Sequence, residues 1–151
     1  MELVVTGNVV LVFQVMSNDL STPKVAYCPN DKDHAIATDF NSDFTAKNIS
    51  YFVGLDADPQ HPQMFLSGDD NFALDGVPEK SGLLELSTKA PVAWTSGRHD
   101  DSYNAVLGPL RRIISFGNIS LADGSVAAVR NSGFKNLLSQ TGAATIRLAI
   151  P

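Results

Sequence analysis

An Asp-Gly pair between two apolar, β-branched runs is the feature that most constrains the fold of this chain. The segment NISLADGSVAAV, residues 118–129, places Asp123 and Gly124 between two such runs. Asp-Gly pairs favour the type I′ turn, in which both central residues take positive φ angles. The segment therefore predicts a β-hairpin with Asp123 and Gly124 at its turn.

The other patterns predict short strands and helices without a repeating βαβ order. Apolar or β-branched runs predict strands in KVAYC (24–28), ISYFVGLDAD (49–58), QMFLSGDDN (63–71), LLELST (83–88), VAWT (92–95) and TIRLAI (145–150). The runs at 49–58 and 63–71 are expected to pair as a hairpin around PQHP. A short helical segment is predicted over 12–23, where Phe13, Met16 and Leu20 have helical spacing.

Two further helices are predicted in the second half of the chain. YNAVLGPLRRIISF (103–116) has helical spacing, with Pro109 near its start and Gly117 after its end; its apolar positions are Val106, Leu110, Ile113 and Ile114. In NSGFKNLLSQTG (131–142), Asn131 or Ser132 is the expected N-cap and Gly142 the C-terminal glycine. Together these elements predict one α+β domain over residues 1–151, mostly antiparallel sheet with short helices.

Composition limits the classes of partner. The chain has 151 residues, 44% of them hydrophobic, and a formal net charge of −5, which argues against nucleic acid or anionic lipid as a main partner. The charge is uneven: residues 19–75 hold ten Asp and three Lys (−7), whereas residues 98–151 hold three Asp and six Lys or Arg (+3). Such polarity suits cation binding or head-to-tail association in a homo-oligomer.

The N-terminal region carries no recognisable targeting or membrane-spanning pattern. The first basic residue is Lys24, after the apolar VVLVF (9–13), and no run approaches the roughly 18 apolar residues of a spanning helix. Cys28 is the sole cysteine, so neither an internal disulfide nor a CxxC metal motif is possible. It is expected to be a small buried hydrophobic residue.

Four aspartates form the candidate metal site. Asp56 and Asp58 follow one strand of the predicted 49–71 hairpin, and Asp69 and Asp70 follow the other. Carboxylate oxygens are calcium ligands, so this hairpin could gather a calcium site. The segment lacks the glycine and the distal glutamate of an EF-hand loop, which favours solvated loop carboxylates instead.

Motifs for catalysis are weak. His34, His61 and His99 have no partner at metal-ligand spacing and are expected at the surface. A hydrolase could be assembled from His99, Asp100 and a serine, but the chain contains no GxSxG elbow and no glycine-rich phosphate loop. An enzyme would gain support if His99 and an acidic partner converged in a pocket. Trp94 is expected in the core or at an interface.

Several segments, taken in order, resemble a known family. The segments are FQVMSNDLSTPKVAYCP, NISYFVGLDAD, PQMFLSGDDN, AWT, GNISLADGSV and RLAIP. They resemble the globular head of prepilin-type, type II secretion pseudopilin-like proteins of the H-X9-DG class. By this resemblance the family motif comprises His99, Gly117, Asn118, Asp123 and Gly124. Here 23 residues separate His99 from Asp123 instead of nine, which indicates an insertion of about 14 residues within 100–116.

The resemblance implies a non-enzymatic structural subunit in the periplasm or at the cell surface. Its partners would be other pilin-like subunits or secretion-system proteins, with membrane contact only through an N-terminal helix that this sequence does not contain. Without that helix an apolar sheet face would be uncovered, and the 103–116 helix is expected to cover part of it. The alternative is a small calcium-dependent binding or adhesion module, in which the aspartate loops and Trp94 line the ligand site.

Overall fold

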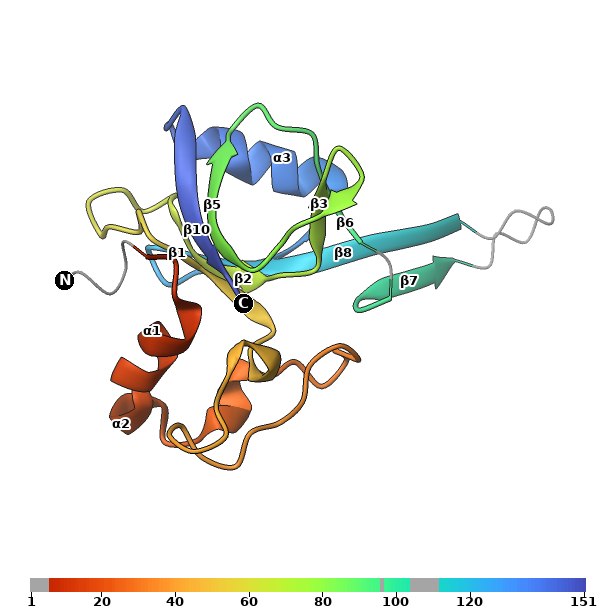
Figure 1. Ribbon diagram of the computed structural model, residues 1–151. Coiled ribbons are helices and arrows are strands. Elements are labelled where there is room, and N and C mark those ends of the chain that lie inside the picture. The colour runs from red at the N-terminus through yellow and green to blue at the C-terminus, as the bar shows by residue number, and fades with distance from the viewer. Residues whose placement is uncertain (1–5, 96, 104–111) are drawn as a thin grey trace.

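The computed structural model describes residues 6–95, 97–103 and 112–151 (Figure 1). Its main sheet has the strand order β5-β10-β1-β2-β8-β7, and β9 also pairs with β8; a smaller sheet has the order β4-β3-β6. The strands are β1 (Tyr51–Gly54), β2 (Phe65–Asp69), β3 (Phe72–Leu74), β4 (Val77–Pro78), β5 (Gly82–Ser87), β6 (Val92–Trp94), β7 (Asp100–Tyr103), β8 (Arg112–Leu121), β9 (Val126–Arg130) and β10 (Thr145–Ile150). All of these pairings are antiparallel, so the predicted α+β class is confirmed.

One face of the main sheet packs against helix α3 (Asn131–Gln140) and the small sheet (Figure 1). Because side chains alternate along a strand, Phe52 of β1 and Ile119 of β8 both enter this core, where neither has exposed surface. Trp94 of β6 stacks on Phe134 of α3 with ring centroids 4.4 Å apart. Trp94 is therefore a core residue, one of the two positions predicted for it.

The N-terminal segment covers the opposite face over β1 and β10. It contains α1 (Val9–Val15), α2 (Ser17–Leu20) and the 3-10 helices η2 (Pro23–Ala26) and η3 (Ala46–Asn48). Phe13 of α1 packs in a second apolar cluster that includes Val53 of β1 and Ala149 of β10. The helical segment predicted near residues 12–23 is thus confirmed. The strand predicted at 24–28 is wrong, because Pro23 starts η2 and Thr22 caps it.

Strands β7 and β8 include residues for which the sequence predicts a helix over 103–116. Asp100 of β7 pairs with Ser115 of β8, and Asp101 pairs with Ile114. The β-branched Ile113 and Ile114 suit a strand, and pairing with β7 overrides their helical spacing. The helix is therefore wrong for Tyr103 and for residues 112–116, while Val106, Pro109 and Leu110 lie outside the described residues. Figure 1 shows β7 and the start of β8 projecting beyond the rest of the sheet, so these two described strands do not cover the sheet face.

The hairpin predicted at residues 118–129 is confirmed, but its turn differs. Ser120 of β8 pairs with Val126 of β9, and the Gly124 N–H donates to the Leu121 carbonyl at 2.9 Å. Only Gly124 has positive φ here (84°), as expected for a three-residue loop that ends in a left-handed glycine. Asp123 accepts hydrogen bonds from the Ser125 N–H and hydroxyl, which is ordinary turn chemistry.

The positive φ pair that defines a type I′ turn occurs at the chain's other Asp-Gly pair. Asp75 (φ 53°) and Gly76 (φ 78°) connect β3 to β4, and their flanking residues Leu74 and Val77 pair directly. The same dipeptide thus closes two different turns. The number of residues that the flanking strands leave unpaired decides which turn forms.

The length and the C-terminal end of helix α3 match the prediction, but the N-cap residue is Arg130 and not Asn131 or Ser132. Asn131 is the first helical residue, and its side-chain oxygen accepts from the backbone N–H of Trp94 at 2.8 Å instead of capping the helix. Gly142 takes φ 73° just after the helix, as predicted. No helix among residues 6–95, 97–103 and 112–151 has both the length and the apolar character needed to span a bilayer.

Candidate functional site

Polar and charged side chains gather where the N-terminal segment meets one end of β2. Asp69 ends β2 and pairs with Tyr51 at the start of β1. The chain before β1 is held there because the Ser50 N–H donates to the Ala26 carbonyl and the Ser50 hydroxyl accepts from the Cys28 N–H, at 2.8 and 3.0 Å. Residues 28–34, 69–70 and 98–99 thereby come together although they are distant in sequence.

The first half of this site is an ion-pair group, which consists of Asp31, His34, Asp70 and Arg98. The Arg98 guanidinium forms an ion pair with Asp31 at 2.5 Å and another with Asp70. It also donates to the Ser50 carbonyl at 3.0 Å. His34 Nδ1 contacts Asp31 at 2.8 Å. All four side chains are at least four-fifths buried, so these contacts are protected from water.

The charges in the ion-pair group have unequal surroundings. Burial raises the pKa of Asp31, but hydrogen bonds from Ser50, the Asp33 N–H and His34, together with the charge of Arg98, bring it below the ordinary value of 3.8. For Asp70 burial outweighs the attraction of Arg98, and the pKa is raised. Burial lowers the pKa of Arg98, but the nearby Asp70 and Asp31 raise it by more. The pKa therefore lies above its ordinary value, and the guanidinium stays charged.

The second half is a thiol–imidazole group, which consists of Cys28, Asp69 and His99. His99 Nε2 lies 3.7 Å from the Cys28 Sγ and 3.4 Å from Asp69 Oδ2. The same carboxylate oxygen accepts from Asn118 through its backbone N–H at 2.6 Å and its side-chain amide at 3.1 Å. Asp69 is 1% exposed, and its other oxygen, Oδ1, has no hydrogen-bond partner among the described residues.

The thiol–imidazole group does not have the geometry of a nucleophilic relay. In a triad, the histidine contacts the nucleophile and the carboxylate through its two different ring nitrogens. Here one nitrogen, Nε2, faces both Cys28 and Asp69. His99 and an acidic partner do converge, but without the order of contacts that would activate the thiol. Nearby, burial and the adjacent Cys28 and Asp69 raise the pKa of Tyr51 to about 12, so its phenol is neutral.

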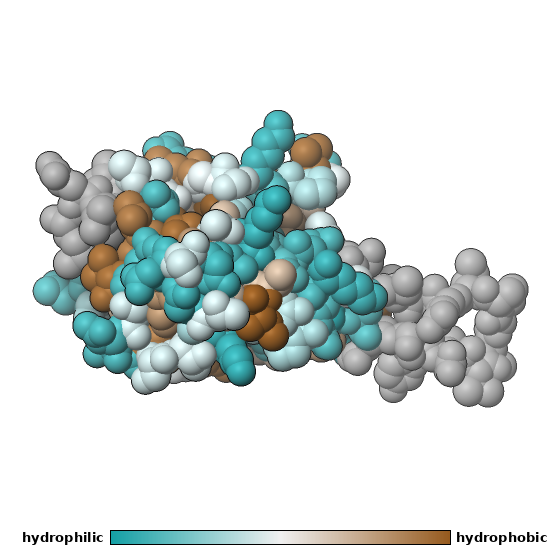
Figure 2. Space-filling view, turned by 60° about the horizontal axis from the view of Figure 1, so that its bottom comes forward, coloured by the Kyte–Doolittle hydropathy of each residue, from teal (hydrophilic) through white to brown (hydrophobic). Residues whose placement is uncertain are grey.

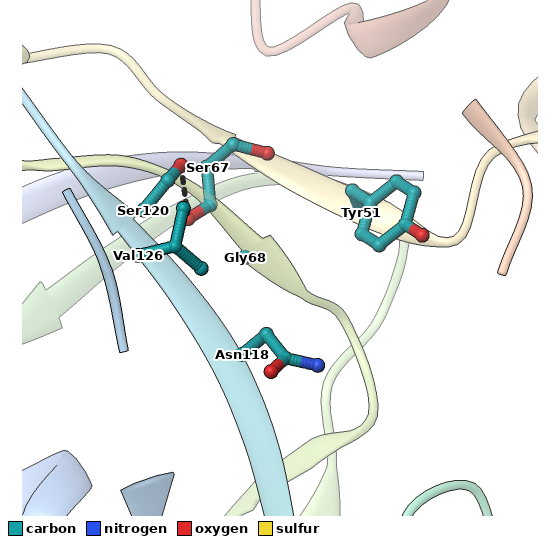
Figure 3. Close-up of a pocket in the computed structure, with 6 residues that line it drawn as sticks. All are labelled: Tyr51, Ser67, Gly68, Asn118, Ser120 and Val126. Carbon is teal, nitrogen blue, oxygen red and sulfur yellow. Dashed lines mark hydrogen bonds between the residues drawn. The ribbon is translucent and has the colours of Figure 1, made fainter. Parts of the chain in front are cut away.

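A shallow hollow of about 220 Å³ lies beside the thiol–imidazole group, on the face of the sheet that the N-terminal segment leaves open. Its lining residues are Tyr51, Ser67, Gly68, Asn118, Ser120 and Val126 (Figure 3). Figure 3 shows Ser67, Ser120 and Val126 close together, with the Ser120 hydroxyl bonded to the Ser67 carbonyl, and Tyr51 and Asn118 farther along. Those two residues border Asp69.

The four aspartates predicted as a calcium site do not come together. Because β1 and β2 are antiparallel, Asp69 lies opposite Tyr51 at the start of β1, whereas Asp56 and Asp58 follow the far end of that strand. Burial raises the pKa of Asp56, but hydrogen bonds from Arg147 and the charge of its guanidinium, with which Asp56 forms an ion pair, bring that pKa below its ordinary value. Asp58 bonds to the Gln60 N–H in the connecting loop. Strands of a hairpin that both end in carboxylates place them at opposite ends of the sheet.

The residues of the expected family motif have separate surroundings. His99 contacts Cys28 and Asp69, Asn118 bonds to Asp69, and Gly117 lies against Trp94, where a Cβ would come within 2.6 Å of the indole ring. Asp123 and Gly124 form the β8–β9 turn, in which Asp123 bonds to Ser125. His99 and Asp123 thus have different partners.

Sequence reasoning missed Arg98, Asp31 and the site role of His34. The prediction that His34 and His99 are surface residues is wrong, since their side chains are only 16% and 15% exposed; His61 is exposed as predicted. Cys28 is buried as predicted but also contacts a histidine. In the sequence, the residues of this site stand out as two adjacent pairs, Asp69-Asp70 and Arg98-His99. Neither pair belongs to a recognised metal-binding or catalytic motif.

Comparison with known proteins adds no relative: no family model, no curated protein and no solved structure matches this chain.

Proposed function

We propose that this chain is a non-enzymatic structural subunit that resembles the soluble head of a type II secretion or type IV pilus pseudopilin. The observation that carries the proposal is the packing of α1 on the sheet. Val9 and Phe13 of this N-terminal helix bury against the sheet face that carries Val53 and Ala149. In pilin-like proteins a long N-terminal helix covers one face of an antiparallel sheet, and here the short α1 covers part of such a face in its place.

The contacts of the motif residues also favour an architectural role. Gly117 permits the close approach of the Trp94 ring, and Asn118 holds the buried Asp69. Gly124 supplies the positive φ of the hairpin turn. Each residue thus secures packing or chain direction, which is what a structural subunit requires.

The open part of the α1-bearing sheet face is the proposed contact surface. It comprises the hollow beside Asn118 and the neighbouring edge strand β9, in which Val126 is 68% exposed. In Figure 2 the view toward the bottom of Figure 1 is mainly hydrophilic, with hydrophobic residues in separate patches. Among the described residues β9 pairs with β8 alone, and such a strand edge beside a shallow hollow suits another pilin-like subunit or a second copy of the chain.

The proposal is tested in the organism that encodes the chain, with an epitope-tagged copy expressed from its own gene. Surface shearing and chemical cross-linking should recover the protein in the periplasm or at the cell surface, linked to pilin-like or secretion-system subunits. Val126→Glu should abolish these cross-links, because it places a charge in the apolar contact. Val77→Glu is the matched control, since Val77 is 62% exposed in the small sheet.

The proposal fails if the wild-type protein is confined to the cytoplasm, or if it cross-links to no pilin-like or secretion-system subunit. Equal behaviour of the two valine variants would instead move the contact away from β9.

A further inference from the structure

We propose that Cys28, Asp69 and His99 form a zinc-binding site. With ordinary zinc bond lengths and tetrahedral angles, the sulfur and nitrogen ligands lie about 3.6 Å apart, and the nitrogen and oxygen ligands about 3.3 Å apart. The measured separations are 3.7 Å for Cys28 Sγ to His99 Nε2 and 3.4 Å for His99 Nε2 to Asp69 Oδ2. Two of the three separations therefore match those of a zinc tetrahedron, and all three donor atoms lie within 4.8 Å of one another.

The unpartnered oxygen of Asp69 points to a missing ligand. Asp69 is 1% exposed and Oδ1 has no partner among the described residues, although a buried charged oxygen without one is costly. Oδ2, the oxygen that faces His99, accepts two hydrogen bonds from Asn118, and these fix the orientation of the carboxylate as groups behind a metal-bound carboxylate commonly do. A cation beside this carboxylate would neutralise its charge.

The donor types select the metal. A thiolate and an imidazole are poor ligands for calcium or magnesium, which prefer oxygen, and good ligands for zinc. The thiolate of Cys28 and the carboxylate of Asp69 together balance a divalent charge. Three protein ligands leave one coordination position for water or a small anion.

The adjacent ion-pair group is unsuited to the same role. Asp31, His34 and Asp70 also lie close enough to share an ion. There the Arg98 guanidinium already forms ion pairs with both carboxylates, so a cation would have to displace it. The Asp69–His99 side has no such cation in contact with it among the described residues.

A zinc site here is independent of the proposed assembly role. The bound ion would cross-link separate segments of the chain. Cys28 belongs to the N-terminal segment, Asp69 ends β2, and His99 precedes β7. One ion would tie together three segments that are distant in sequence, and so would stabilise the folded protein by an amount that grows with the logarithm of zinc concentration over the dissociation constant.

The first test uses the wild-type chain, purified with chelator, reduced and then titrated with zinc and, separately, with cobalt(II). We expect one zinc per chain by elemental analysis, a melting temperature that rises with zinc concentration, and a thiolate-to-cobalt charge-transfer band in the near ultraviolet. Because Cys28 is the sole cysteine, that band can come from no other residue. Absence of bound zinc, or cobalt binding without the band, would overturn the proposal.

The second test compares Cys28→Ser and His99→Gln with the matched control His34→Gln, each checked for folding by circular dichroism without metal. Loss of a direct ligand should raise the zinc dissociation constant by more than the about 10- to 100-fold typical of a lost outer-shell contact. His34→Gln should bind as the wild type does. Zinc binding that is lost in His34→Gln but kept in Cys28→Ser would assign the ion to the other group and overturn the proposal. Neither result depends on assembly into a filament.

Discussion

The two halves of the buried polar site differ in how their charges are balanced. In the ion-pair group, one guanidinium contacts two carboxylates, Asp31 and Asp70, so each carboxylate has a cationic partner supplied by the chain itself. In the thiol–imidazole group, Asp69 has only neutral amide donors and a histidine at 3.4 Å, and one of its oxygens has no partner among the described residues. The adjacent residues Asp69 and Asp70 thus differ in whether the Arg98 guanidinium contacts them directly.

This difference assigns the two groups different roles. The ion-pair group has a role in the stability of the fold, and the thiol–imidazole group is a candidate binding site. A buried charge that is fully paired contributes little net stability, but removing its partner is expensive. A buried carboxylate with an unused oxygen retains capacity for a cation. The following predictions test this division, beginning with the largest effect.

Arg98→Met should destabilise the protein most. It leaves Asp31 and Asp70 buried without a cation, at a cost of about 3–5 kcal/mol in the free energy of unfolding. Urea denaturation at neutral pH measures the loss. Arg147→Met is the matched control, because it breaks the half-exposed ion pair with Asp56 and should change stability far less. Adding Asp31→Asn and Asp70→Asn to Arg98→Met should recover part of the loss; no recovery would contradict the charge explanation.

Asp69→Ala should be the next largest effect in metal-free protein. The change leaves the partly buried Asn118 N–H without its acceptor, which costs up to about 1–3 kcal/mol. It removes a charge as well, and so leaves none unpaired. Urea denaturation in the presence of chelator measures it, with Asp58→Ala in the exposed loop as the control. A loss equal to that of Arg98→Met would erase the proposed difference between the groups.

The sheet was largely predictable from sequence because its signals are local. The strands at 49–58, 63–71 and 145–150 read as β-branched or aromatic runs, and the Asp123-Gly124 hairpin follows from turn chemistry. The error over 103–116 is also physical. Two consecutive isoleucines satisfy a helical period and a strand equally well, and only pairing with residues 100–103 decides between them.

The site was poorly predictable because its contacts are non-local. Arg98 meets Asp31 across 67 positions, and Cys28 meets His99 across 71, so no spacing rule connects them. The proposed calcium site went wrong for a topological reason: antiparallel neighbours put their last residues at opposite ends of the sheet. The family resemblance identified the motif residues in the sequence but did not predict which residues they contact.

Acid should weaken the ion-pair group through Asp31 and strengthen it through Asp70. The folded pKa of Asp31 is lowered, so its contribution is present above 3.8 and is lost as the pH falls through the folded value. The folded pKa of Asp70 is raised, so its contribution is present below 3.8 and is lost as the pH rises through the folded value.

Urea midpoints measured from about pH 6 to about pH 2 test these two signs. Asp31→Asn should make the loss of stability in acid shallower, and Asp70→Asn should make it steeper. Asp39→Asn, in an exposed loop, is a useful reference because its carboxyl pKa is also lowered, by hydrogen bonds from Ser42 and Asn41. Identical slopes for Asp31→Asn and Asp70→Asn would mean that the two carboxylates do not differ as the ion pairs indicate.

His34→Gln should have the smallest effect of the series. His34 contacts Asp31 at 2.8 Å, but Arg98 remains to pair with that carboxylate, and a glutamine amide can still donate to it. The expected loss is that of one ordinary hydrogen bond or less, about 0.5–1.5 kcal/mol. His61→Gln is the control at an exposed position, and its free energy of unfolding should change by less than about 0.5 kcal/mol. A loss for His34→Gln as large as that for Arg98→Met would show that the histidine, and not the guanidinium, holds the two carboxylates in place.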